Sequence, residues 1–406
     1  MRCGNTGGLV LFLDAGGTGQ VGHGLAPETG QHRKRKSFVD TGHTQLFSGE
    51  NRLMRHPWVF VMLGLTAFGV PTATEAQLEI SSRASSIQIG GRVHAQYAAS
   101  SVDDANNDFF LRRVRLIADI TLNDFASARV QPDFAQGKIA LQDVYVRLGF
   151  SSKFRVSAGQ FKRAFDIFEL SSSTDLSIIE RDARVEGASG CSGVSGICSY
   201  SRLTQKLKYS ERDQGIKIDG SSGRVSYQAT LTNGTGINVS DENDAKSYSG
   251  HLTLAVSENV RVSGQLGVHD YLIESAEAST ERGIAWGADV EFGTWRDGAH
   301  IQASVIRGDN WKSLDSDHNE ATFLTTQIVA SYYSERSGRL SGIEPLIRLS
   351  FGDPDTAVGK NAGTVVTPGL MFYLQGKSKI GANLDIYSPQ SGETALSFKV
   401  QTYLYF

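Results

Sequence analysis

The sequence lacks an excess of charge of either sign, a long apolar run and more than three cysteines. Its 406 residues include 40 Lys and Arg against 43 Asp and Glu, for a net charge of −3. This balance excludes a dedicated nucleic-acid binder and a polybasic protein of the membrane surface. The mean hydropathy of −0.23 excludes a membrane protein built from many helices. With 40% hydrophobic and 9% aromatic residues, the chain is also not disordered.

The most apolar stretch, Trp58 to Val70, has 13 residues, whereas a spanning helix needs about 20. A basic start, Met54-Arg55-His56, precedes it, and Pro71 ends it. Thr74-Glu75-Ala76 then offers small residues for cleavage before Gln77. This layout predicts a signal peptide over residues 54–76, with a buried core helix as the alternative.

The predicted leader divides the chain into three parts. Residues 1–53 are glycine-rich and aperiodic, and we expect a disordered extension upstream of the true start codon. Residues 54–76 are the signal peptide, and residues 77–406 are the mature protein. The residues before 77 hold 7 Lys and Arg and 5 Asp and Glu, which leaves a net charge of −5 on the mature part.

From Ile87 onward, apolar and polar residues alternate with a period of two. Val260–Val268 and Ile284–Phe292 show the pattern, and the last segment places Leu396, Phe398, Val400, Leu404 and Phe406 on one face. Strict alternation predicts strands with one apolar and one polar face. The fold class is therefore all-β.

Short and long connections alternate between these strands, as in an outer-membrane barrel. We count about 16 strands, although 14 or 18 would also fit. The 330 mature residues give each strand and its connection about 20 residues, against the roughly 9–11 that a spanning strand needs. The prediction is a transmembrane antiparallel β-barrel.

Four motifs resemble the phosphate-selective porins O and P. The terminal Phe406 is similar to the assembly signal of outer-membrane barrels in general. The motifs are Phe110-Leu-Arg-Arg-Val-Arg-Leu116; Val130-Gln-Pro-Asp-Phe134 with Leu141-Gln-Asp-Val-Tyr145; Ala158-Gly-Gln-Phe-Lys162 with Ser171-Ser-Ser-Thr174 and Ile179-Glu-Arg181; and Tyr227-Gln-Ala-Thr-Leu-Thr-Asn-Gly-Thr-Gly236.

The resemblance implies a 16-stranded, usually trimeric channel whose third loop folds into the lumen as a constriction. That loop is the region Lys162–Asp213, and the constriction candidates are Lys162, Arg163, Arg181 and Arg184. The region holds eight basic and eight acidic residues. Such a neutral constriction does not indicate strong anion selectivity.

Charged residues on the polar face of the strands should point into the lumen. An arginine facing lipid at mid-depth would cost about 2–4 kcal/mol. These residues either form ion pairs along a solvated wall or provide an anion ladder, since guanidinium binds phosphate through two hydrogen bonds. The predicted channel-lining cations are Arg113, Arg115, Arg129, Arg147, Arg155, Arg261, Arg348 and Lys399.

Cys191 and Cys198 lie seven residues apart in the third loop. In an oxidising periplasm they predict a disulfide, with two free thiols as the alternative. No spacing of His and Cys predicts a metal site. No hydrolase or metalloprotease motif is present, so we expect neither an enzyme nor a cofactor.

The sequence therefore predicts a porin of a Gram-negative outer membrane. Its partners would be outer-membrane lipid and small hydrophilic solutes or anions such as phosphate, with no nucleic acid, and it would form a homotrimer. Diffusion through a water-filled channel would be passive. The alternative is a closed barrel that serves as a structural protein, a receptor or an adhesin.

Overall fold

The computed structural model describes residues 83–406 except 242, 274–278 and 315–318. The predicted extension over residues 1–53 and the predicted signal peptide over residues 54–76 lie outside the described residues. The described helices are short, and none is long and apolar enough to cross a membrane.

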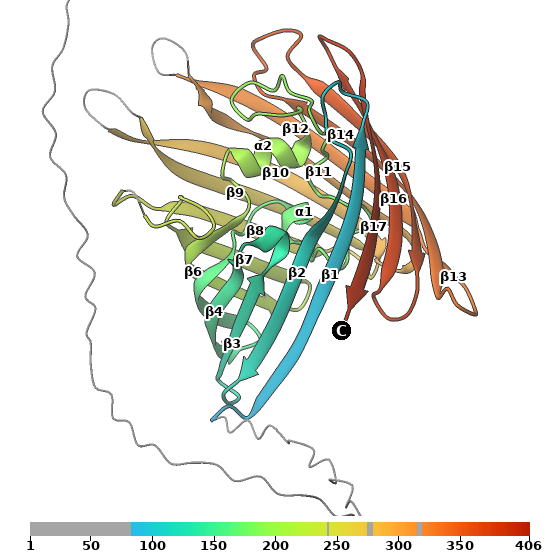
Figure 1. Cartoon of the computed structure of the whole chain (residues 1–406). Coiled ribbons are helices and arrows are strands. Elements are labelled where there is room, and N and C mark those ends of the chain that lie inside the picture. Colours follow the sequence, from blue (N-terminus) through green and yellow to red (C-terminus); the bar gives the residue numbers. More distant parts are fainter. Residues whose placement is uncertain (1–82, 242, 274–278, 315–318) are drawn as a thin grey trace, which may run out of the picture. The chain divides into compact units, whose positions relative to one another are not determined.

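The described chain forms one closed antiparallel barrel, in which each strand pairs with its neighbours in sequence and the first pairs with the last (Figure 1). Sixteen long strands make the wall, which confirms the predicted number. The strands are β1 (Ser86–Ser100), β2 (Asp108–Thr121), β3 (Ala126–Asp133), β4 (Ala140–Ser151), β5 (Phe154–Lys162), β6 (Arg212–Ser222), β7 (Val225–Thr232), β8 (Ser247–Ala255), β9 (Val260–Ile273), β10 (Ser279–Thr294), β11 (Asp297–Leu314), β12 (Glu320–Tyr332), β14 (Gly342–Asp353), β15 (Gly363–Tyr373), β16 (Lys379–Pro389) and β17 (Ala395–Tyr405). The two-residue strand β13 (Ser334–Glu335) pairs with β14 close to the end of β12.

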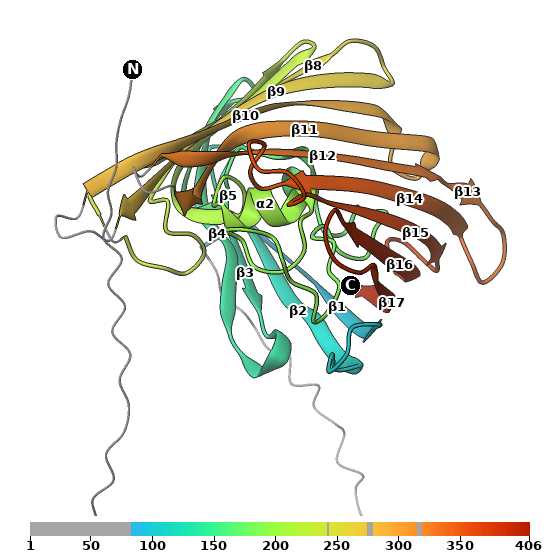
Figure 2. The same cartoon turned by 90° about the horizontal axis from the view of Figure 1, so that it is seen from above.

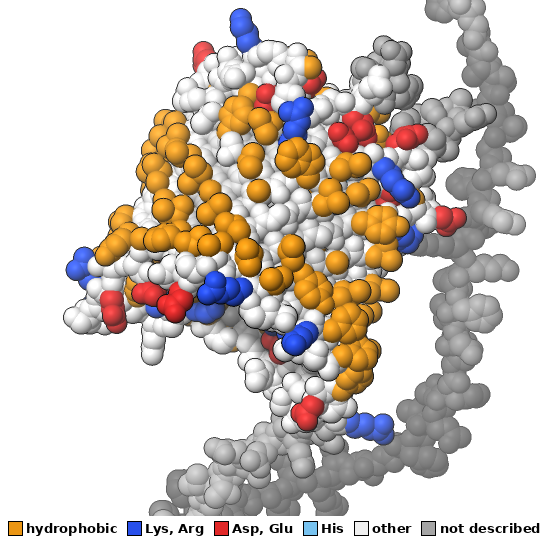
Figure 3. Space-filling model, turned by 180° about the vertical axis from the view of Figure 1, so that it is seen from behind, with side chains coloured by type: hydrophobic (Ala, Val, Ile, Leu, Met, Phe, Trp, Pro, Cys, Tyr) orange, Lys and Arg blue, Asp and Glu red, His pale blue; other side chains and the backbone are white. Residues whose placement is uncertain are grey.

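Apolar and polar side chains alternate along each strand, which gives the sheet an apolar outer face and a polar inner face. In β14, Ile347 and Leu349 are exposed on the outside, whereas Glu344 and Arg348 are buried on the inside. Figure 3 shows apolar side chains spread over the outer wall, with few charged side chains among them. Because every strand has two paired neighbours, the closed sheet leaves no free edge in the membrane.

Connections at one end of the barrel are short, as between β2 and β3 or between β6 and β7, and those at the other end are longer. The longest covers residues 163–211, between β5 and β6. It contains the helices α1 (Ile167–Leu170) and α2 (Tyr200–Lys206). A single 3-10 turn, η1 (Ala135–Gly137), joins β3 and β4. We refer to residues 163–211 as the inner segment, because Figure 2 shows its helix α2 within the ring of strands.

Candidate functional site

The inner segment packs against the wall through an apolar cluster. Phe168, Tyr200 and Leu203 are fully buried with Phe323 and Tyr373, which belong to β12 and β15. Burying large apolar side chains typically contributes about 1.5–3 kcal/mol each. The segment is thus a fixed part of the barrel interior.

Asp166 joins the two helices of the inner segment. Its Oδ1 accepts hydrogen bonds from the amide of Phe168 at 2.9 Å and from the hydroxyl of Tyr200 at 3.0 Å. Its Oδ2 accepts one from the hydroxyl of Thr204 at 2.9 Å. Burial, followed by the charge of Glu169, raises the pKa of Asp166 to about 7.

Arg163 does not take the pore-facing position that the sequence predicted. It is 1% exposed, and its guanidinium donates hydrogen bonds to the carbonyls of Lys208 and, at 3.2 Å, Val268. These carbonyls belong to the end of the inner segment and to β9. Arg163 therefore ties the two stems of the segment to the wall instead of facing solvent.

Two of the predicted channel-lining cations hold the inner segment in place. Arg348 and Lys399 are each 1% exposed, and they share Asp385 at 2.6 and 2.8 Å. Arg348 also donates to the carbonyl of Glu180 at 2.7 Å, and Lys399 donates to the carbonyl of Arg184. Both side chains do point inward, but the segment covers them.

A β-bulge brings two consecutive arginines to the inner face of β2. His94 of β1 pairs with Arg113 and Ala95 pairs with Leu111, so Arg112 is the extra residue. Strict alternation would have sent Arg112 to the lipid side. The bulge therefore makes room for a second inward cation, which a period-two pattern cannot predict.

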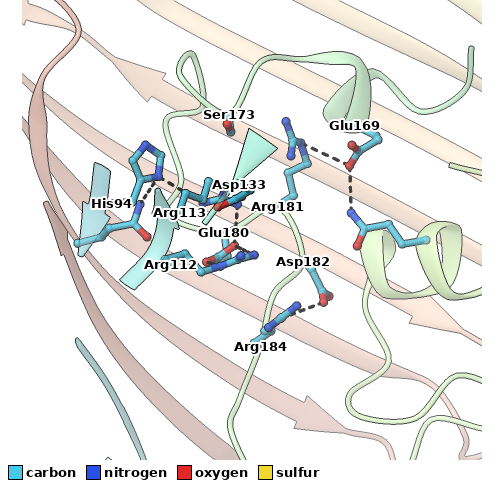
Figure 4. A network of polar contacts seen from close by, with 12 residues as sticks. His94, Arg112, Arg113, Asp133, Glu169, Ser173, Glu180, Arg181, Asp182 and Arg184 are labelled. Carbon is cyan, nitrogen blue, oxygen red and sulfur yellow. Dashed lines mark hydrogen bonds and ion pairs between the residues drawn. The ribbon is translucent and has the colours of Figure 1, made fainter. Parts of the chain in front are cut away.

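Arg112 and Arg113 both contact the carboxylate of Glu180 from the inner segment (Figure 4). Arg112 binds it through two nitrogens: Nε contacts Oε1, and Nη2 lies 3.0 Å from Oε2. Arg113 Nη2 lies 3.4 Å from Oε2. Burial raises the pKa of Glu180, but the two guanidinium groups outweigh it and hold the pKa well below its usual range. The carboxylate is therefore ionised at neutral pH.

An inner cavity of about 230 Å³ lies between the inner segment and the wall of strands β1 to β7. Seven cationic side chains and one carboxylate, Asp143, are among its lining residues. Four of the cations, Arg115, Arg129, Lys162 and Arg181, are among those predicted from the sequence. The sequence analysis did not select the other three, which are Arg92, Lys217 and Arg212.

Alternation gives a signal for two of these omitted residues. Lys217 stands between Ile216 and Ile218, and Arg92 precedes Val93, which lies on the outer face. Arg212 was only counted among the charges of the third loop. Period-two placement would have located Lys217 and Arg92 on the inner wall. It would not have located Arg212, which shares a period-two face with the exposed Ile216.

Several cations of the inner cavity have carboxylate partners. Arg115 pairs with Asp133 at 2.6 Å, Arg129 with Asp119 at 2.7 Å, and Arg212 with Asp143 at 2.8 Å. Arg181 lies 3.7 Å from Glu169, and Lys162 lies 4.0 Å from the same side chain.

Arg92 and Lys217 form no ion pair among the described residues. Arg92 donates to the hydroxyls of Ser173 at 2.6 Å and Thr174 at 3.1 Å. Lys217 lies 5.1 Å from the ring centre of Phe161. Four carboxylates thus partner five of the seven cations, which leaves the cavity with an excess of positive charge.

The other predicted channel-lining residues lie towards the short turns. Arg147 and Arg155 flank Asp219, and Arg261 pairs with Glu291 at 2.8 Å. A cavity of about 110 Å³ is lined here by Arg155 and Asp219, among others. Gln228 lines both this cavity and the inner cavity, so the two are neighbours.

An outer cavity of about 730 Å³ lies at the end with the long connections. It is lined by Phe110 of β2 and by residues 183–188 of the inner segment, including the half-exposed Arg184. Cys191 and Cys198 form a disulfide close to this cavity, which is also lined by Gly196 and Ile197. Within the described parts of the chain, no cluster of three or more His, Cys, Asp or Glu side chains could hold a metal ion.

Comparison with known proteins places this geometry among porins. The model of the family described as phosphate-selective porin O and P matches residues 87–276. No curated protein matches the sequence.

Solved structures share the fold at low sequence identity. The anion-selective porin from Comamonas acidovorans aligns with a TM-score of 0.55 at 13% identity, over 79% of this chain and 99% of its own. OmpF of Salmonella typhi, in complex with Daunomycin, gives 0.54 at 10%, over 80% and 99%. OmpT of Vibrio cholerae, in its trimer form, gives 0.53 at 12%, over 79% and 99%.

Proposed function

We infer that this protein forms an anion-preferring pore. The premise is that the chain is an outer-membrane porin, which over residues 87–276 belongs to the phosphate-selective porin O and P family. The chain forms a channel for small solutes in the outer membrane. Its solutes move down their gradients, without a chemical step. As in the trimer form of OmpT, three copies would associate side by side.

The observation that supports anion preference is the charge of the inner cavity. Seven cations and one carboxylate line it, and Arg92 and Lys217 have no carboxylate partner within the described part of the chain. Low-dielectric walls concentrate the field of such charges, so the cavity attracts anions and repels cations. Guanidinium groups also match oxyanions such as phosphate through paired hydrogen bonds.

The proposed solute path has three stages. Solutes enter the outer cavity at the long connections, pass the inner segment, and reach the inner cavity. They leave through the region of Gln228 and Asp219 at the short turns. The constriction candidates Lys162 and Arg181 line the inner cavity.

Reversal potentials under a KCl gradient test the proposal, with the purified protein in planar bilayers. We expect stepwise conductance with chloride preferred over potassium. Lys217→Gln should lower this preference about two- to threefold, because it removes a cation without breaking an ion pair. Lys360→Gln, in an exposed outer loop, is the matched control and should change it little.

Two results would contradict the proposal. Cation preference in the unaltered protein would reject the anion pore while leaving the porin assignment intact. A correctly assembled barrel without conductance would instead favour the closed structural or receptor barrel.

A further inference from the structure

We propose that Glu180 is a specificity-determining residue of this pore, whose carboxylate occupies an oxyanion-binding pair, Arg112 and Arg113, and exchanges with a permeating anion. The inference rests on the proposed anion-preferring channel. In that channel, the Glu180 carboxylate competes with permeating anions for Arg112 and Arg113, and this competition decides which anions pass.

The contact has the geometry of a bound oxyanion. Both oxygens of Glu180 are engaged: Arg112 approaches them with Nε and Nη2, and Arg113 adds Nη2 at 3.4 Å. A guanidinium binds the two oxygens of a carboxylate and two oxygens of a phosphate in the same manner. The bulge on β2 supplies two guanidinium groups to one acid, so the pair retains a net positive charge beside Glu180.

The contact also lies between the outer and inner cavities. On β2, Phe110 lines the outer cavity and Arg115 lines the inner one. On the inner segment, Arg184 lines the outer cavity and Arg181 the inner one. Within the described chain the two cavities share no lining residue. Arg112 and Arg113 lie between Phe110 and Arg115 on β2, and Glu180 directly precedes Arg181 on the inner segment. On the proposed path, an anion that moves along β2 from one cavity to the other passes Arg112, Arg113 and the Glu180 carboxylate that they hold.

Burial makes the exchange selective. Glu180 is 4% exposed and Arg113 is 5% exposed. Removing the carboxylate alone would leave two cations in a poorly solvated place, which is strongly unfavourable. A permeating anion with two or more oxygens restores the lost hydrogen bonds, whereas a cation does not. Oxyanions are thus the class of solute that can replace Glu180.

The backbone of the inner segment need not move during this exchange. Arg348 holds the carbonyl of Glu180 at 2.7 Å and that of Arg181 at 3.2 Å. Only the Glu180 side chain has to rotate. Arg184 is 48% exposed, pairs with Asp182 at 3.3 Å through Nε, and acts on the Glu180 carboxylate through its charge, so its remaining nitrogens can contact the displaced acid.

A purely structural role for Glu180 predicts a different behaviour. If Glu180 only fastened the inner segment to β2, its loss would loosen the segment and widen the pore. Conductance would then rise for chloride and potassium alike, without a change in their ratio. If Glu180 competes for the arginines, its loss changes the ratio and exposes a binding site.

Glu180→Gln in the full protein distinguishes these roles in planar bilayers. We expect the chloride-to-potassium permeability ratio to rise about fivefold or more, because one negative charge leaves the proposed solute path. Inorganic phosphate should block chloride current at about tenfold lower concentration, since the arginine pair becomes free to bind it. Glu291→Gln is the matched control, because Glu291 pairs with Arg261 on the inner wall, away from the inner segment.

Equal changes in the Glu180 and Glu291 variants would overturn the inference. So would a rise of both ion currents at constant selectivity. If Glu180→Gln fails to assemble, Glu180→Asp keeps the charge but shortens the reach, and it should still lower the blocking phosphate concentration. Cation preference in the unaltered protein would reject the anion pore, whereas the shift between variant and parent still tests Glu180.

Discussion

The protonation of Asp166 should set how tightly the inner segment is held between pH 4 and pH 7. Its pKa is about 7 in the folded protein, against an ordinary value of 3.8. A carboxyl whose pKa is raised by folding stabilises the folded state fully below its ordinary pKa. This contribution is lost as the pH rises through the folded pKa. At about 1.4 kcal/mol per pKa unit, the loss between pH 4 and pH 7 is about 4 kcal/mol, and it stays constant above pH 7.

Two other acids of the inner segment also make its stability depend on pH. Glu169 acts at lower pH than Asp166, and Glu211 acts in the same direction as Asp166. Burial raises the pKa of Glu169, but the charges of Arg181, Lys162 and Arg212 outweigh the effect of burial, so that the pKa is lowered. The stabilisation that Glu169 contributes is therefore lost only below pH 4.5. Burial raises the pKa of Glu211, which therefore adds to the effect of Asp166. Stability of the segment should thus fall from pH 5 to pH 7.

Hydrogen exchange measures this local stability. The amides of Leu170 and Ser171, at the end of α1, and of Leu203 and Leu207, within and directly after α2, donate to backbone carbonyls within the segment. After correction for intrinsic exchange, their protection should fall by a factor approaching about 10³ between pH 4 and pH 7, with no further fall above pH 7. Amides in the centre of β14 provide the internal reference.

Two variants separate Asp166 from the remaining groups. Asp166→Asn imitates the protonated acid and should remove most of the pH dependence. Thr204→Val removes a hydrogen bond that lowers the pKa of Asp166, so the loss of protection should continue above pH 7. A parent protein with constant protection from pH 4 to pH 8, or an Asp166→Asn variant with an unchanged slope, would refute the reasoning.

Two further predictions concern the stability of the interior. Asp385→Asn should lower the free energy of unfolding by about 3–5 kcal/mol, because Arg348 and Lys399 would lose their buried counter-ion; an unchanged urea midpoint would contradict this. Replacing Cys191 and Cys198 by serine removes a short covalent loop and should cost roughly 2–3 kcal/mol of local stability. Proteolysis near residues 191–198 should then accelerate, while the urea midpoint of the barrel stays the same; equal cleavage with and without the disulfide would count against it.

Alternation in the sequence predicts the wall of this barrel well, since each inner or outer position depends only on its neighbours in the strand. It correctly sends Arg115, Arg129 and Arg348 inward. It fails at Arg112, because a bulge depends on the register between β1 and β2 and leaves no local pattern. A pattern of period two is therefore sufficient for the fold but not for the arginine pair that contacts Glu180.

Exposure of the inward cations was not predictable from the sequence. Arg348 and Arg129 both point inward from their strands, yet the inner segment covers the first and leaves the second beside a cavity. The difference arises from contacts between residues more than 160 positions apart, such as Arg348 with Glu180. Arg163, next to Lys162 in sequence, is likewise drawn into a buried contact by carbonyls of distant residues.

The seam between β1 and β17 has a consequence for the order of biogenesis. It joins Arg92 to Tyr405, near opposite ends of the described chain, and the Gly91 amide donates to the Phe406 carbonyl at 2.9 Å. The ring can close only after the final residues have been synthesised and delivered. The last four strands also carry Arg348 and Lys399, which hold the carbonyls of Glu180 and Arg184. Insertion into the membrane and the final shaping of the permeation path are therefore one event, and a truncated protein would lose both together.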